Sequence, residues 1–112
     1  MTNTIIALAW AHWLADFVLQ SDQMARNKST SNFWLLAHVW VYSITLAAFF
    51  GWEYALINGL AHAAVDACTS RINSRLWKAG KVHYFFVGVG FDQALHFTIL
   101  FLTIPLIRLT FS

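Results

Sequence analysis

The chain has 112 residues, of which 59% are hydrophobic and only 11% are charged, and its mean hydropathy is +0.58. These values lie well outside the usual balance of a soluble domain and indicate an integral membrane protein. The net charge of +2 fits orientation in a bilayer and contact with anionic headgroups, and it gives no case for nucleic-acid binding.

About 20 apolar residues cross the hydrocarbon core of a bilayer as a helix. Four such stretches are predicted, at about residues 4–20, 33–52, 54–70 and 82–107. The second contains no Asp, Glu, Lys or Arg, whereas the first and third are short and each carries one His and one Asp. We therefore expect an all-α, polytopic membrane protein with a single transmembrane domain, residues 1–112. A soluble helical bundle would need polar outer faces, which the second stretch lacks.

The motif Ala-His-x-x-x-Asp occurs twice, as "AHWLAD" at residues 11–16 and as "AHAAVD" at residues 61–66. Each copy lies about two-thirds of the way along a predicted span, and the two spans run across the membrane in the same direction. The repeat predicts a four-transmembrane-helix bundle built as two helical hairpins in one orientation, in the manner of parallel transporter repeats.

Basic residues are concentrated in the two linkers that lie on one side of the predicted bundle. Because cytoplasmic loops collect Lys and Arg, these linkers are predicted to be cytoplasmic and both termini to lie on the non-cytoplasmic side of a multi-pass protein. The linker residues are Arg26, Lys28, Arg71, Arg75, Lys78 and Lys81, against only Arg108 near the carboxyl end.

Pairs of His and Asp four residues apart share one face of a helix. The first and third spans carry them as His12/Asp16 and His62/Asp66, and the fourth reverses the order as Asp92/His96 in "FDQALH". Because the fourth span runs in the opposite direction, the reversal puts the three Asp at one depth, with the His about 6 Å away along the helix axes. His38 of the second span lies at about the depth of the Asp. We expect one polar core in the cytoplasmic half of the bilayer.

A charged side chain near the bilayer centre costs roughly 2.5–3.5 kcal/mol on insertion scales, so the three Asp must face one another, a partner or water. Carboxylates held close together repel unless they are protonated or bridged by cations. Mixed His and carboxylate donors suit a divalent metal, zinc first, with manganese or iron as alternatives. A proton or ion path, or a network that only specifies helix packing, is also open. The candidate metal ligands are His12, Asp16, His38, His62, Asp66, Asp92 and His96.

One function that fits these residues is hydrolysis of a lipid-linked or headgroup ester by metal-activated water, with Asp16, Asp66 or Asp92 moving the proton. Gln20 and Gln93 are candidates for substrate binding. Arg71 is a candidate for holding a phosphate, and it fits equally a positive-inside anchor. The alternatives are a proton- or cation-coupled small-solute transporter or channel-like homo-oligomer, and a small scaffold subunit that modulates a host membrane complex.

Four segments of the sequence carry a recognisable pattern: "LAWAHWLADFVLQSDQMARNK", the "AH" of the second span, "GLAHAAVDACTSR" and "GFDQALH". Together they resemble the DUF3307 family of small bacterial and phage membrane proteins, which has no assigned function. The resemblance covers most of the chain and implies a location in the bacterial inner membrane. It also implies polar positions at His12, Asp16, Gln20, Asp22, His38, His62, Asp66, Asp92, Gln93 and His96.

Overall fold

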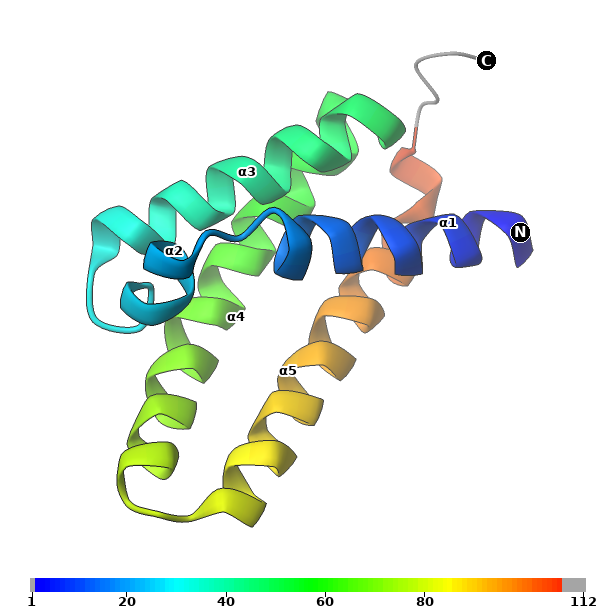
Figure 1. The fold of residues 1–112 in the computed structure, drawn as a ribbon. Helices are drawn as coiled ribbons and strands as arrows, with labels where there is room; N and C mark the ends of the chain where they lie inside the picture. The colour runs from blue at the N-terminus through cyan, green and yellow to red at the C-terminus, as the bar shows by residue number, and fades with distance from the viewer. Residues whose placement is uncertain (1, 108–112) are drawn as a thin grey trace.

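The structure is a computed structural model that describes residues 2–107, and within that range it contains helices and no strand, which confirms the all-α prediction. Figure 1 shows the arrangement. The elements are α1 (Thr2–Trp13), the π-helix η1 (Leu14–Val18), α2 (Asp22–Asn27), α3 (Asn32–Phe50), α4 (Trp52–Lys78), α5 (Val82–Leu102) and the 3₁₀ helix η2 (Ile104–Leu106). Arg108, used above for the charge asymmetry, lies outside the described residues.

The first predicted span is not one regular helix. The α-helical pattern ends at Trp13 and continues as a π turn, in which the Leu19 amide donates to the carbonyl of Leu14 over 2.9 Å. Residues 19–21 are not helical, so the span ends earlier than predicted. The following linker contains α2, which begins at the Ser21 cap, whose hydroxyl accepts from the Met24 amide.

The C-terminal ends of α4 and α5 also differ from the sequence prediction. The segment 71–78, expected as linker, is the last part of α4. Its basic residues lower the hydropathy that marks a span, but Arg, Leu and Lys are good helix formers. At the other end of the hairpin, α5 stops at Leu102 instead of residue 107. Pro105 explains this, because its ring lacks an amide donor and clashes with a helical carbonyl four residues earlier.

Helix α4 lies between α3 and α5 and packs against both, while α1 and η1 pack across the assembly. Two glycines make the tight connections. Gly51, with a φ of 95°, is the single residue between α3 and α4, and Gly80, with a φ of 73°, lies in the turn between α4 and α5. The Gly51 turn, the start of α1 and η2 lie toward one end of the molecule, and the Gly80 turn lies toward the other (Figure 1).

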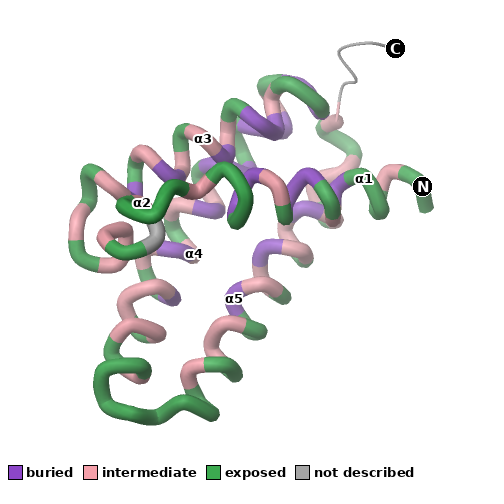
Figure 2. The backbone as a smooth tube through the Cα atoms, in the orientation of Figure 1, coloured by how far each residue is buried: buried purple, intermediate pink, exposed green. Residues whose placement is uncertain are grey.

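The distribution of buried residues differs from that in a soluble protein. Among the described residues, ten polar or charged side chains are buried, as many as the buried hydrophobic ones, whereas large apolar side chains such as Phe33, Trp40 and Leu102 are 69–75% exposed. Figure 2 shows exposed segments along the outside of all the long helices. Buried hydrophobic residues, among them Leu8, Leu46 and Leu100, form a core that adjoins the polar side chains through Tyr42. Two helices, α3 and α5, are long and apolar enough to cross a membrane.

Candidate metal centre

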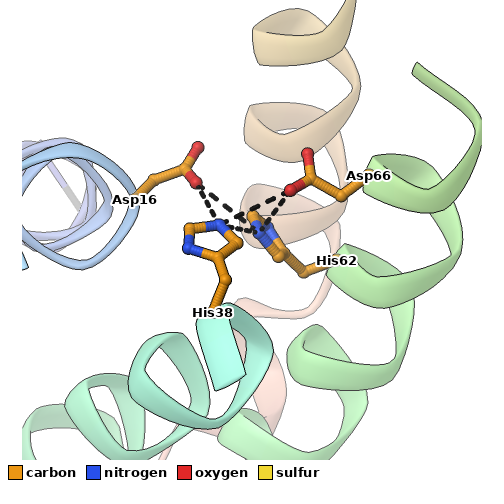
Figure 3. Close-up of side chains that lie close together, drawn as sticks. All are labelled: Asp16, His38, His62 and Asp66. Atoms are coloured by element: carbon orange, nitrogen blue, oxygen red, sulfur yellow. Dashed lines mark hydrogen bonds and ion pairs between the residues drawn. The ribbon is translucent and has the colours of Figure 1, made fainter. Parts of the chain in front are cut away.

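Four buried side chains from η1, α3 and α4 point toward one another in the middle of the bundle (Figure 3). His38 Nε2 lies 2.8 Å from Asp16 Oδ1 and 2.9 Å from His62 Nε2. Each imidazole Nε2 also lies 3.5 Å from Asp66 Oδ2. Two nitrogens and two carboxylate oxygens thus converge on a single point, with their donor atoms all within 4.8 Å of one another.

The spacing of these donor atoms fits a small divalent cation. Ligand atoms about 2.0–2.1 Å from a tetrahedral zinc lie about 3.4 Å from one another. Three of the separations between the donor atoms are 3.5 Å and two are 2.8–2.9 Å. Asp66 Oδ2 is buried and makes no hydrogen bond to a described residue, although the Lys28 ammonium lies 3.3 Å from it as an ion pair. Two His and two Asp form a donor set that zinc, manganese or iron accepts.

A second group of possible ligands adjoins the first and shares Asp16 with it. It consists of Asp16, Asp92 and His96, all buried. His96 Nε2 lies 3.3 Å from Asp92 Oδ1 and 3.7 Å from Asp66 Oδ1, and it makes no hydrogen bond to a described residue. The two groups together bring the three aspartates of the predicted polar core into one cluster.

The ring of His62 is held by stacking on both faces. Tyr42 stacks on it at a centroid distance of 4.0 Å and His96 at 4.3 Å. Neither Nδ1 of His62 nor Nδ1 of His38 has a hydrogen-bond partner among the described residues. A metal-binding His is usually oriented through a hydrogen bond at its other nitrogen. Here the orientation of His62 is set by packing.

His12, a sequence-predicted ligand, lies beside the cluster but belongs to neither ligand group. Its Nδ1 lies 3.0 Å from the Tyr42 hydroxyl and its Nε2 lies 2.7 Å from Gln93 Oε1. Asp16 Oδ2 is more distant from Nε2, at 3.5 Å. Both ring nitrogens of His12 are therefore engaged by neutral side chains.

Asp92 is oriented by two neighbours. The Thr69 hydroxyl donates to Oδ1 over 2.5 Å and the Gln93 amide donates to Oδ2 over 3.0 Å. Because Gln93 donates to a carboxylate, its oxygen is the atom that faces His12. One chain of hydrogen bonds therefore runs from Tyr42 through His12 and Gln93 to Asp92.

A cavity of about 690 Å³ adjoins the cluster, and Asp16, Asp66 and Asp92 lie in its wall. This volume is in the range of pockets for small ligands. Further polar lining comes from Gln20, Arg26, Lys28, Ser29, Thr69, Ser70, Asn73, Ser74 and Gln93. The apolar lining consists of Phe17, Trp77, Phe85, Phe86 and Val89.

The comparison with protein families matches residues 4–111 to a family described as proteins of unknown function, DUF3307. The chain belongs to this family. The resemblance seen in the sequence is thereby confirmed, and the whole cluster of this DUF3307 protein lies inside the matched region. No curated protein and no solved structure matches the chain.

The remaining residues singled out in the DUF3307 sequence lie in different surroundings. Gln20 and Gln93 line the cavity, and Gln20 Oε1 is buried without a hydrogen-bond partner among the described residues. Arg71 does not line it; its guanidinium donates to the Ala67 carbonyl and to Asn32 Oδ1. Asp22 is exposed in the first turn of α2.

Three residues of the site were not found from the sequence. Tyr42 is four residues after His38 and Thr69 is three after Asp66, so helical spacing alone places each beside a known site residue. Lys28 is different. Its Nζ lies 3.3 Å from Asp66 Oδ2, yet in the sequence it is one basic residue of a linker. Only the path of the chain after α2 brings it to the cluster.

Proposed function

We propose that the protein is a multi-pass inner-membrane protein in which α1 with η1, α3, α4 and α5 span the bilayer, with both termini on the non-cytoplasmic side. The burial pattern supports this, because apolar side chains cover the outside of the helices while polar side chains occupy the interior. Exposed Trp52 and Trp77 mark the ends of α4, about 38 Å apart at 1.5 Å per residue. That span matches a hydrocarbon core with an aromatic belt on each side.

In this proposal Asp16, His38, His62 and Asp66 bind a divalent metal, zinc in the first place. The convergence of these four donor atoms inside the bundle is the observation that carries the proposal. A buried group of like-charged carboxylates and unsatisfied nitrogens needs a cation or shared protons, and the separations between the donor atoms suit the cation.

The activity we propose is hydrolysis of a lipid-linked or headgroup ester. A divalent metal held by Asp16, His38, His62 and Asp66 would supply a water of lowered pKa, and Asp92, whose carboxylate lines the cavity, would accept the proton of that water. The deprotonated water would add to the acyl carbon or phosphorus of the ester. The bond from that atom to the leaving oxygen breaks, and the leaving oxygen takes the proton from Asp92.

The placement of the polar residues favours an enzyme over a transporter. Beyond His12 and Tyr42, the interior toward the Gly51 turn contains Leu8, Leu46 and Leu100, all at most 1% exposed. The buried polar groups of Tyr54 and Asn58 in this region are already hydrogen-bonded, the Tyr54 hydroxyl to the Leu100 carbonyl and the Asn58 amide to the Tyr54 carbonyl and the Thr103 hydroxyl. A transport path needs polar groups on both sides of its site. The cavity, by contrast, adjoins the cluster on the side of the predicted cytoplasmic linkers.

The test is elemental analysis of the full chain, purified in detergent without chelator, with Asp66→Asn beside it. We expect stoichiometric metal in the wild type and its loss in Asp66→Asn. Asp22→Asn is the matched control, because Asp22 is exposed and outside both ligand groups. Wild-type protein without metal, and with a thermal midpoint that added zinc does not change, would refute the metal site.

The activity needs its own assay. Zinc-loaded protein is incubated with short-chain phospholipids and the released headgroup or fatty acid is measured. We expect product with the wild type and none with Asp92→Asn, provided that Asp92→Asn still binds zinc in the first group. Zinc-loaded wild type that releases nothing from any phospholipid class would leave the metal site standing and contradict the proposed hydrolysis.

A further inference from the structure

The cavity beside the cluster has two cations facing three carboxylates. Lys28, which is 18% exposed, lies 3.3 Å from Asp66 Oδ2 with its ammonium group, and Arg26 is the second basic residue of the lining. The ion pair occupies the oxygen that Asp66 presents to the first ligand group. A metal ion and the Lys28 ammonium therefore compete for the same carboxylate oxygen.

The sign of the charge in the cavity depends on the metal. With neutral histidines, Asp16, Asp66 and Asp92 contribute −3 and Arg26 and Lys28 contribute +2, which leaves −1. A bound divalent cation changes this sum to +1. It also releases the Lys28 ammonium from Asp66, so that a donor of three hydrogen bonds becomes available to another anion.

Another part of the cavity lining is aromatic. Trp77 of α4 and Phe85 of α5 lie with ring centroids 5.0 Å apart, and Phe86 is next to them. Trp77 and Phe86 are 57% and 62% exposed, so the cavity continues into the apolar outer surface of the hairpin. A ligand that fits this lining is anionic at one end and apolar at the other.

We propose that the cavity binds a phosphate group carried by a lipid, that the Lys28 ammonium moves from Asp66 to this phosphate, and that binding requires the metal. The inference rests on the proposed metal site and adds the substrate class. Lys28 contacts the substrate, and Trp77 and Phe86 hold the first part of its acyl chain.

The test uses isothermal titration of zinc-loaded full-length protein in detergent with three probes. These are dihexanoyl phosphatidic acid, dihexanoyl phosphatidylcholine and inorganic phosphate. We expect phosphatidic acid to bind at least about tenfold more tightly than either of the others, since only it combines an unshielded phosphate with an apolar chain. In protein treated with a chelator we expect this preference to disappear.

Variants separate Lys28 from general effects of charge. Lys28→Gln should weaken the binding of phosphatidic acid about tenfold and leave that of phosphatidylcholine unchanged, and Lys28→Arg should keep most of the affinity. Lys78→Gln removes an exposed charge that does not line the cavity, and should change neither. The thermal midpoint of Lys28→Gln, measured in the same samples, shows whether that variant is folded.

Each other outcome overturns the inference in a recognisable way. Zinc binding without a preference for phosphatidic acid refutes the substrate class and leaves the proposed metal site intact. Inorganic phosphate that binds as tightly as phosphatidic acid identifies a site for free phosphate. An affinity that Lys28→Gln does not change removes Lys28 from the site, and a preference that survives the chelator removes the role of the metal. Failure to bind zinc refutes both proposals.

Discussion

His12 Nε2 lies 2.7 Å from Oε1 of Gln93, although the two residues are 81 positions apart in the chain. Because the Gln93 oxygen can only accept, the imidazole of His12 donates from Nε2. In the neutral ring Nδ1 is then an acceptor, and the Tyr42 hydroxyl donates to it. Both nitrogens of His12 are thereby used to hold neighbours of the cluster, so His12 acts as a positioning residue.

Replacing His12 should therefore reduce stability without removing metal. His12→Ala leaves the buried Tyr42 hydroxyl without this partner, which costs about 1–3 kcal/mol, and also removes the partner of the partly buried Gln93 oxygen. We expect a lower thermal midpoint in detergent and an unchanged metal content. His83→Ala, at an exposed position, is the control. Loss of metal in His12→Ala would instead make His12 a ligand, as the sequence interpretation had it.

The shared position of Asp16 predicts a graded effect of two aspartate substitutions. Asp16 belongs to both ligand groups, whereas Asp92 belongs only to the second. Asp16→Asn should lower zinc affinity at least about tenfold, because loss of a ligand costs at least as much as an outer-shell change, whose effect is about 10–100-fold. Asp92→Asn should retain the first group's zinc. Competition with a chromophoric chelator measures both, and equal losses would contradict the division into two groups.

Bound metal should raise stability by mass action. With free zinc at about 100 times its dissociation constant, the free energy of unfolding rises by about 2.7 kcal/mol. We expect added zinc to raise the thermal midpoint of chelator-treated wild type and to leave that of Asp66→Asn where it was. A similar increase in both proteins would indicate that zinc acts elsewhere on the chain.

Helices α3 and α4 approach closely at Gly59, where an added Cβ would overlap the Ser43 hydroxyl and lie 3.3 Å from Ser43 Cβ. Gly59→Ala should therefore destabilise the fold by about 1–3 kcal/mol through overpacking. Adding Ser43→Ala to this variant should restore much of the lost stability, because it removes the hydroxyl that the new Cβ would overlap. Gly90→Ala meets no atom within 4 Å and should stabilise α5 by about 0.5–1 kcal/mol. The measurement is thermal unfolding of the wild type, Gly59→Ala, Gly59→Ala with Ser43→Ala, and Gly90→Ala. Equal changes in stability for Gly59→Ala and Gly90→Ala would argue against close packing at Gly59.

The proposed topology predicts which side of the membrane each end of α4 faces. In a Cys68→Ser background, Glu53→Cys should react with a membrane-impermeant maleimide in right-side-out vesicles, and Lys78→Cys only in inverted ones. In the wild-type chain, Cys68 is exposed on α4 between these positions, and we expect it to stay unlabelled in both kinds of vesicle because the proposed topology places it against lipid. Labelling of both ends from one side would exclude α4 as a membrane span.

Much of the fold follows from local spacing. Hydropathy marks four helical regions, and the four-residue interval between His62 and Asp66 places both on one face without any knowledge of the rest of the chain. The ends of the helices were less predictable. Hydropathy measures compatibility with lipid and not helix formation, so the basic end of α4 up to Lys78 was taken for a linker.

The sequence by itself determined that the described part of the chain is helical and that His and Asp share helix faces, because helical periodicity acts over a few residues. It also determined that the chain belongs to the DUF3307 family. Only the tertiary structure decided which donor atoms meet. The π turn at Asp16 and the crossing of α1 over α3 and α5 set His12 against Gln93, and they leave His38 to face Asp16. The return of the chain after α2 brought Lys28 to Asp66. Such contacts depend on helix crossing angles and on the path of loops, which no spacing within one helix encodes.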